Sequence, residues 1–229
     1  MPIAFDSASS LAASSGVSTI SWNHTVGTSV NSILIVSAGF RTTASSLVDT
    51  TAVTYGGVSL TKAISFANQT GARTQVRENL WYLLNPASGV SSIHVTYSNS
   101  SISFPHGAFG VSYTGTSGVG NTSASTATSS GPLLSFNITS SQNLAIGGFR
   151  SNIDVLLSTS GSETLRVAST AGTDYGGIAD ESVSLQGDVT IRLNGGTAVA
   201  NVVVGLELLT TVTAVVSSLF LLNLMGVGR

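Results

Sequence analysis

The sequence has 229 residues, of which 42% are hydrophobic and only 8% are Asp, Glu, Lys or Arg. Charged residues usually make up about 25% of a soluble protein, so Ser, Thr, Asn and Gly must cover most of this surface. The bases are one Lys and seven scattered Arg; without clustered positive charge we expect no nucleic-acid binding. Cysteine is absent, which excludes disulfides and thiolate metal sites.

Short runs of alternating apolar and polar residues, separated by turn residues, occur along most of the chain. The turn signals include Gly56-Gly57, Asn85-Pro86 and Asn194-Gly195-Gly196. No segment before residue 209 has a helical period, so the predicted fold class is all-β. The expected strands cover 17–22, 32–40, 52–55, 58–64, 73–84, 91–97, 107–114, 133–138, 143–149, 163–168, 175–183, 188–193 and 198–208.

The two halves of the chain resemble each other, which indicates an internal duplication. Such halves form either two small sandwiches or one larger one; we predict a single jelly-roll-like β-sandwich over residues 1–209, with a crossing loop over 115–131. The pseudo-repeats cover about 17–115 and 131–209. The matching segments are 21–25 with 135–139, 32–41 with 143–150, 60–63 with 165–168, and 110–113 with 205–208.

The segment 80–84 places Leu80, Tyr82 and Leu84 on one face of a strand and Trp81 with Leu83 on the other. Because both faces are apolar, this pattern favours a central strand buried on both sides. The alternative is an exposed Trp81 that serves as a glycan platform, since aromatic side chains on a β-sandwich are suited to stacking on sugars.

The C-terminal segment, residues 210–229, has no charge before Arg229. As a helix it forms an apolar stripe; as a strand, its β-branched start is equally suitable. A membrane span needs about 20 largely apolar residues, and Thr, Ser, Asn and Gly interrupt this run, so we do not expect insertion. We predict that it mediates oligomerisation, the alternative being that it packs as the last element of its own sandwich. The residues expected at the interface are Val212, Val215, Val216, Leu219, Phe220 and Leu222.

Histidines provide no recognisable site, because His24, His94 and His106 lie far apart and have no ligand-type neighbours. His94 alternates with core residues and is expected to face solvent. The sequence has neither a nucleophile elbow nor a phosphate-binding loop. We therefore predict no catalytic residue, no metal ligand and no cofactor.

Four acidic residues in the second half are the remaining candidates for chemistry. They offer oxygen ligands for calcium or a carboxylate pair for a glycosidase, but they lack the Asp-x-Asp-x-Asp spacing of a calcium loop. We expect them to be solvated surface residues. They are Asp174, Asp180, Glu181 and Asp188.

Residues 53–62, 80–86 and 107–115 resemble a β-sandwich module that occurs in bacteriophage structural proteins and bacterial surface proteins. The similarity covers roughly residues 3–208 and excludes the C-terminal segment. Its motifs are strands and turns, so the resemblance implies a fold more than a function, and it carries over no catalytic residue.

This resemblance implies a structural virion component, such as a capsid-decorating, fibre or tail protein, that assembles with itself and with other virion proteins. The N-terminal residues Met1–Asp6 have no signal-peptide pattern, so we expect synthesis in the host cytoplasm and release with the virion. The first alternative is a carbohydrate-binding module for attachment to glycans. The second is a hydrolase that acts on polysaccharide through Asp180 or Glu181.

Overall fold

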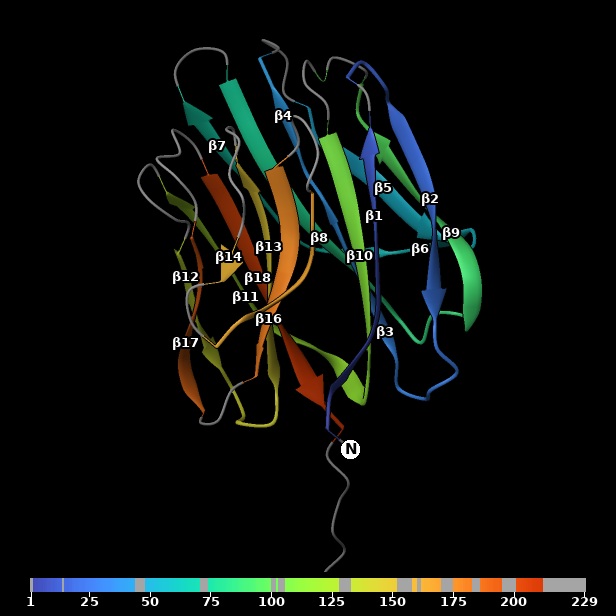
Figure 1. The fold of residues 1–229 in the computed structure, drawn as a ribbon, viewed down its shortest axis with the longest axis vertical. Coiled ribbons are helices and arrows are strands. Elements are labelled where there is room, and N and C mark those ends of the chain that lie inside the picture. Colours follow the sequence, from blue (N-terminus) through green and yellow to red (C-terminus); the bar gives the residue numbers. More distant parts are fainter. Residues whose placement is uncertain are drawn as a thin grey trace, which may run out of the picture.

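The computed structural model of the chain describes residues 2–13, 15–43, 48–70, 74–99, 102, 106–127, 133–151, 158–159, 162–169, 175–182, 186–194 and 201–211. The predicted all-β class is confirmed, since these residues form 18 strands and no helix (Figure 1). No element among these described ranges is a helix that could cross a membrane.

The first half of the chain forms two antiparallel sheets. The first inner sheet has the order β1-β10-β3-β8-β4, and β7 also pairs with β8. It comprises β1 (Ala4–Ala13), β3 (Ile33–Ala38), β4 (Phe40–Thr42), β7 (Thr61–Thr70), β8 (Thr74–Leu84) and β10 (His106–Thr114). The first outer sheet has the order β2-β9-β5-β6 and comprises β2 (Thr19–Val26), β5 (Thr50–Tyr55), β6 (Val58–Ser59) and β9 (Gly89–Tyr97).

The second half also forms two sheets. The second inner sheet has the order β11-β18-β13-β16-β15 and comprises β11 (Thr116–Ala127), β13 (Leu144–Ser151), β15 (Thr164–Ala168), β16 (Tyr175–Ser182) and β18 (Asn201–Thr210). The second outer sheet has the order β12-β17-β14 and comprises β12 (Leu133–Ile138), β14 (Ser158–Thr159) and β17 (Gly187–Asn194).

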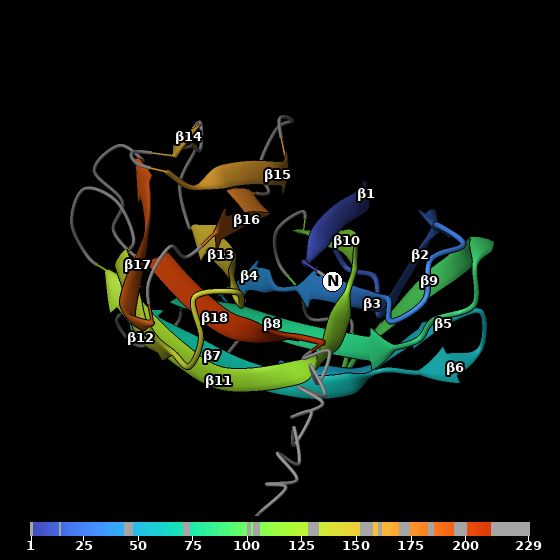
Figure 2. The ribbon, with the colours of Figure 1, turned by 90° about the horizontal axis from the view of Figure 1, so that it is seen from below.

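The four sheets stack as outer, inner, inner and outer layers, which Figure 2 shows side by side. Three separate apolar cores fill the spaces between them. Trp22, Val36 and Val95 belong to the core of the first half, and Phe136, Phe149 and Ile191 to that of the second. The central core joins the two inner sheets and includes Ile35, Leu80, Val111, Ile146 and Val204.

The central strands β3, β10 and β13 of the inner sheets are buried on both faces, which explains why their sequences are mainly apolar. In β3, Leu34 and Val36 point into the first-half core, whereas Ile33 and Ile35 point into the central core. The strands of the outer sheets alternate instead, and β2 buries every second residue. Of the predicted architecture the structure therefore confirms the all-β class alone: a jelly roll has two sheets, whereas the described residues form four, because inner strands with two apolar faces need cover on each.

Residues 115–131 were predicted as a crossing loop, and this prediction is wrong for most of the segment. Thr116–Ala127 form β11, which is the edge strand of the second inner sheet. Its Ser, Thr and Gly residues carry little apolar signal because an edge strand that is half-exposed needs few buried side chains. The N-terminal residues Ala4–Ala13 likewise form the edge strand β1.

Candidate functional site

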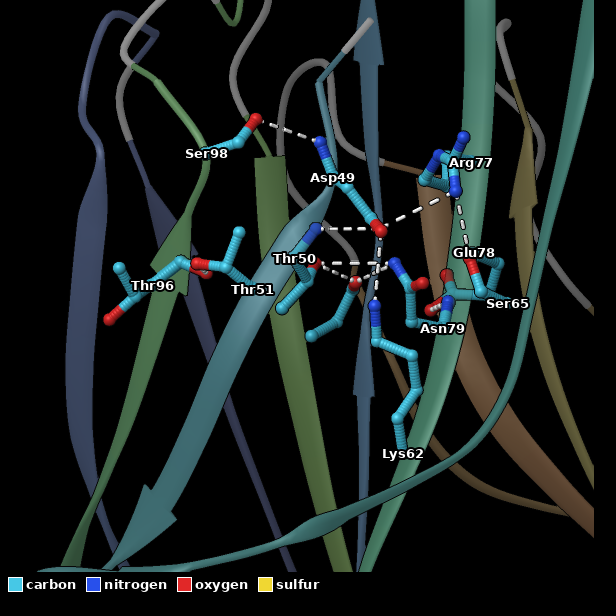
Figure 3. Close-up of polar contacts among 11 residues, drawn as sticks. Asp49, Thr50, Thr51, Lys62, Ser65, Arg77, Glu78, Asn79, Thr96 and Ser98 are labelled. Atoms are coloured by element: carbon cyan, nitrogen blue, oxygen red, sulfur yellow. Dashed lines mark hydrogen bonds and ion pairs between the residues drawn. The ribbon is translucent and has the colours of Figure 1, made fainter.

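A half-exposed charge cluster lies where the first outer and inner sheets meet, and Figure 3 shows its contacts. The carboxylate of Asp49, just before β5, is 3.0 Å from Lys62 Nζ on β7 and 3.5 Å from Arg77 Nη1 on β8. Arg77 Nη1 also donates to Ser65 Oγ at 2.8 Å. This Asp49 cluster places two cations on one carboxylate and so links the start of β5 to β7 and β8.

A buried polar group lies directly beneath the Asp49 cluster (Figure 3). Thr50 Oγ1 donates to the carbonyl oxygen of Ala38 at 2.9 Å, and Asn79 Nδ2 donates to the same oxygen at 2.9 Å. Ala38 is the last residue of β3, so these two side chains satisfy a backbone carbonyl where the strand ends. The role of this group is structural, because a buried carbonyl without a donor is costly.

A second cluster contains Ser, His and Asp, the residue types of a hydrolytic triad. His24, on β2, is 1% exposed. Its Nδ1 lies 2.7 Å from Ser9 Oγ on β1, and its Nε2 lies 3.3 Å from Ser112 Oγ on β10. Burial lowers the pKa of His24 to about 4, although the nearby charge of Asp6 opposes this shift. The imidazole is therefore neutral near pH 7.

The connectivity of this His24 cluster differs from that of a triad. In a triad the carboxylate orients the imidazole. Here the carboxylate of Asp6 instead accepts hydrogen bonds from Ser112 Oγ at 2.7 Å and from the backbone N–H of Gly27 at 2.9 Å. The cluster holds the edge strand β1 against β2 and β10, which is a structural role. Sequence reasoning missed it because β1 had not been identified.

The two inner sheets are joined by a buried ion pair. Arg150 Nε on β13 is 3.1 Å from Glu78 Oε2 on β8, with side-chain exposures of 1% and 0%. Ser37 Oγ donates to Glu78 at 3.0 Å, and Arg150 Nη2 donates to the carbonyl oxygen of Gly107 at 2.9 Å. Burial raises the pKa of Glu78, while the charge of Arg150 and the hydrogen bonds act in the opposite direction.

A second bridge crosses the same interface at the other end of the stacked strands. Tyr113 Oη on β10 donates to Asp180 Oδ2 on β16 at 2.6 Å, and Arg166 Nε donates to the same oxygen at 2.6 Å. The guanidinium of Arg166 also lies 4.6 Å from the ring centroid of Phe5. Burial, followed by the charge of Asp180, raises the pKa of Tyr113 well above its usual value. Asp180 therefore binds the first half of the chain to the second.

Glu207 on β18 is another buried carboxylate, and it accepts four hydrogen bonds. Its donors are the N–H and hydroxyl groups of Thr139 at 2.6 and 2.7 Å, Asn143 Nδ2 at 2.7 Å and the N–H of Asn121 at 3.0 Å. Burial would raise its pKa, but these hydrogen bonds outweigh burial and lower it. Glu207 thus ties β11, β18 and the β12–β13 turn together.

The acidic residues singled out from the sequence do not converge. Asp180 is 2% exposed and faces the first inner sheet, whereas its neighbour Glu181 accepts a hydrogen bond from Ser162 at 2.5 Å. Asp188 lies 3.4 Å from Asn137 Nδ2, and Asp174 is outside the described residues. Within the described ranges, no group of three or more His, Asp and Glu side chains has the spacing of a metal site. The expectation that Asp180 is solvated is wrong.

Aromatic and histidine residues follow the alternation of their strands in three cases. Trp81 is 6% exposed and packs in the first-half core, and Lys62 Nζ lies 4.8 Å from its ring centroid. An indole in this position presents no face to a sugar. Trp22 is also buried, and His94 is exposed, as predicted. The candidate interface residues Val212, Val215, Val216, Leu219, Phe220 and Leu222 lie outside the described residues.

No family model matches the chain, and no curated protein matches it either.

Proposed function

We propose that this chain is a non-catalytic structural component of a virion, made in the host cytoplasm and assembled in several copies. The observation that carries this proposal is the burial of three carboxylates, those of Glu78, Asp180 and Glu207. Each of them binds groups on segments that are distant in the sequence. Satisfied polar networks of this kind rigidify a core. Four sheets linked in this way suit a capsid-decorating, fibre or tail protein, which must resist sliding between its layers. The resemblance of residues 53–62 and 80–86 to a module of bacteriophage structural proteins supports the same role.

We also propose that the two halves arose by duplication, with units of about 4–114 and 116–210. In the inner sheets, the order β1-β10-β3-β8-β7 of the first half corresponds strand by strand to the order β11-β18-β13-β16-β15 of the second. In the outer sheets, β2-β9-β5 corresponds in the same way to β12-β17-β14. A duplicated unit with two apolar sheet faces explains why both inner sheets bury a common central core.

Irregularities in the strand pairing support this duplication. A β-bulge separates Phe5 from Ser7 where β1 pairs with β10, and another separates Val119 from Thr122 at the matching register of β11 with β18. Each bulged strand then hydrogen-bonds across to the outer sheet: Ser7 Oγ donates to the carbonyl of Thr25, and Asn121 Nδ2 donates to the carbonyl of Asn137 at 3.0 Å.

A further pair of bulges matches on the opposite side of the inner sheets. One separates Lys62 from Ile64 where β7 pairs with β8, and the other separates Leu165 from Val167 where β15 pairs with β16. Bulges are specific features that families retain, so coincidence at two matched registers favours a common origin.

The C-terminal segment is the proposed assembly element. Its boundary follows from the last described contacts: the N–H of Thr210 donates to Asn143 Oδ1 at 3.0 Å, and the N–H of Thr211 donates to the carbonyl of Gly115 at 3.2 Å. Both residues therefore belong to the folded stack, and a truncation that tests the segment should end at Thr211.

The experiment compares the sedimentation mass of the full chain with that of residues 1–211. We expect a defined oligomer for the full chain and a folded monomer for the truncated one. Leu219→Asp/Phe220→Asp in the full chain should reproduce the monomer, whereas the matched control Ser217→Ala/Ser218→Ala should not. A full-length monomer, or an oligomer that survives truncation, would refute assembly through this segment.

A further inference from the structure

A pocket of about 530 Å³ opens at one end of the central core, beside the N-terminal end that Figure 1 marks. It is formed by the residues just before β1, the β12–β13 turn and the end of β16. Its volume lies within the range of about 300–1,000 Å³ that is typical of ligand sites. The lining is uncharged: Pro2, Ile3 and Leu144 are apolar, and Ser141, Gln142, Asn143 and Ser182 are polar.

The connection that lines the pocket is shorter than its counterpart in the first half of the chain. After the matched segments 21–25 and 135–139, seven residues (26–32) lead to β3 in the first half, and only four (140–143) lead to β13 in the second. The second half therefore has three residues fewer with which to cover the end of its inner sheet.

The longer connection is also tied to the other half of the molecule. The N–H of Thr116, at the start of β11, donates to the carbonyl of Asn31 at 3.0 Å. The residues just before β1 have the corresponding place beside the short connection, but residue 2 is a proline and has no N–H. A hydrogen bond of this kind cannot form at Pro2, and the pocket lies between Pro2 and the short connection.

The rim of the pocket is also more polar than the matching place in the first half. In the first inner sheet Ile33 lies opposite Leu84, whereas its counterpart Leu144 in the second inner sheet lies opposite Ser182. A hydroxyl group therefore stands where the first half has an apolar side chain. The second half differs from the first at this end both in space and in hydrogen-bonding capacity.

Three of the polar side chains can bind a ligand, and the fourth is fixed. Ser141, Gln142 and Ser182 are exposed, and among the described residues none of their side chains makes a hydrogen bond. Asn143 is only 5% exposed, and its Nδ2 donates to Glu207 Oε1 at 2.7 Å. Asn143 thus forms a fixed floor, while the other three present hydroxyl and amide groups to the pocket.

The charge behind this floor limits the class of ligand. Although burial would raise the pKa of Glu207, its hydrogen bonds lower it, so the carboxylate is negative near pH 7. No lining residue is positive, and an anion would be repelled without a compensating partner. The lining has no carboxylate either, which is the main ligand type of calcium. The chemistry of the pocket therefore fits a neutral ligand with hydroxyl groups.

We propose that this pocket binds a neutral sugar unit of a glycan. The hydroxyl groups of the sugar exchange hydrogen bonds with Ser141, Gln142 and Ser182. Its C–H groups pack against Ile3 and Leu144, which are the apolar part of the lining. This adds attachment to glycans to the proposed structural role. It does not depend on the C-terminal segment, because the lining lies within residues 2–182.

Saturation-transfer NMR on the full chain tests the proposal, because it detects weak binding through magnetisation that passes from the protein to a bound sugar. The probes are the methyl glycosides of glucose, galactose, mannose and N-acetylglucosamine at millimolar concentration. We expect transfer to at least one of them. Glucuronate and galacturonate, which carry a carboxylate in place of a hydroxymethyl group, should receive much less than the corresponding neutral sugars.

Two pocket variants and a matched control locate the binding. Gln142→Ala removes the amide and should weaken the affinity for the bound glycoside about tenfold. Ser182→Leu introduces the residue type of Leu84 and should abolish the transfer. The control Ser29→Leu makes the same change at an exposed serine in the longer connection of the first half, and it should leave the transfer unchanged. Thermal midpoints measured beside each spectrum show that the variants are folded.

Each contrary result has a definite meaning. Absence of transfer to all four glycosides refutes the sugar site. A glycoside that binds Gln142→Ala and Ser182→Leu as strongly as the unaltered chain lies elsewhere, which refutes the pocket as its receptor. Uronates that bind as well as the neutral sugars refute the neutral chemistry. None of these outcomes affects assembly through the C-terminal segment, which the sedimentation mass tests separately.

Discussion

The buried pair between Glu78 and Arg150 provides a sharp test of how the two inner sheets are held together. Arg150→Met removes the charge but keeps most of the side-chain length, and it leaves Glu78 at 0% exposure without its cation. Removing one partner of a buried pair costs about 3–5 kcal/mol. For a chain of this size that corresponds to a fall in Tm of about 6–20 °C.

The effect should depend on pH, and its direction follows from Glu78. Burial already raises the pKa of this carboxyl above its usual 4.5, so the folded state holds the proton more tightly than the unfolded chain. Stability therefore falls as the pH rises above 4.5. Arg150 opposes this shift, so its removal raises the pKa of Glu78 further and extends the loss of stability to higher pH.

Urea unfolding followed at several pH values measures both effects. Because well-packed neutral residues often replace a buried pair at little cost, the double variant Glu78→Gln/Arg150→Met should be more stable at pH 7 than Arg150→Met alone. If Arg150→Met loses less than about 1 kcal/mol at pH 7, or if the double variant is no better than the single one, the pair does not bridge the sheets as described.

Three further predictions concern the other clusters. The pKa of His24 is lowered from 6.5 to about 4, so the unfolded chain binds the proton more readily, and the free energy of unfolding in urea should fall by about 3 kcal/mol in all as the pH drops from 6.5 towards 4. His24→Phe should abolish most of this pH dependence, and a dependence that persists contradicts the assignment. Gly120→Ala places a Cβ 2.3 Å from Glu207 Oε2, displaces that carboxylate from its donors and should cost about 1–3 kcal/mol; an unchanged thermal midpoint would show that Glu207 adapts freely. Lys62→Ala should cost less than about 1 kcal/mol in urea unfolding, because its partner Asp49 is 38% exposed; a larger loss means that the Asp49 cluster is more than a screened surface network.

The proposed duplication shows how far sequence comparison reaches. The match of residues 32–35 with 143–146 agrees with the strand register, since Ile33 and Leu144 occupy the same position relative to β10 and β18, opposite Tyr113 and Leu208. The match of 60–63 with 165–168 equates Thr61 with Arg166 and is displaced by two residues. In the structure the equivalent of Thr61 is Thr164, because Thr61 pairs with Tyr82 and Thr164 pairs with Asp180, and these two partners lie opposite the matched residues Ile35 and Ile146. A shift of two preserves the inward and outward alternation, so a sequence pattern alone does not detect it.

Contacts between the two inner sheets were also beyond sequence reasoning. Arg150 and Glu78 are 72 residues apart, and neither position stands out from the composition around it. Their approach depends on glycines beside each side chain: a Cβ at Gly39, between β3 and β4, would lie 2.4 Å from Glu78 Oε2, and one at Gly176 on β16 would lie 2.8 Å from Arg150 Cζ. Sequence patterns mark a glycine as a weak position for a strand, whereas its role as space for a charged side chain distant in the sequence is visible only in the folded structure.

Alternation within single strands is enough to predict the all-β class, most of the strands, the burial of Trp22 and Trp81 and the exposure of His94. The four layers, the edge strand over residues 116–127 and the cross-links through Asp6, Asp180 and Glu207 appear only when the strands are packed together. Alternation shows which side of a strand is apolar, whereas packing between segments far apart in the chain selects the partner on that side. A carboxylate that looks solvated in the sequence becomes a cross-link when a sheet from the other half supplies its donors.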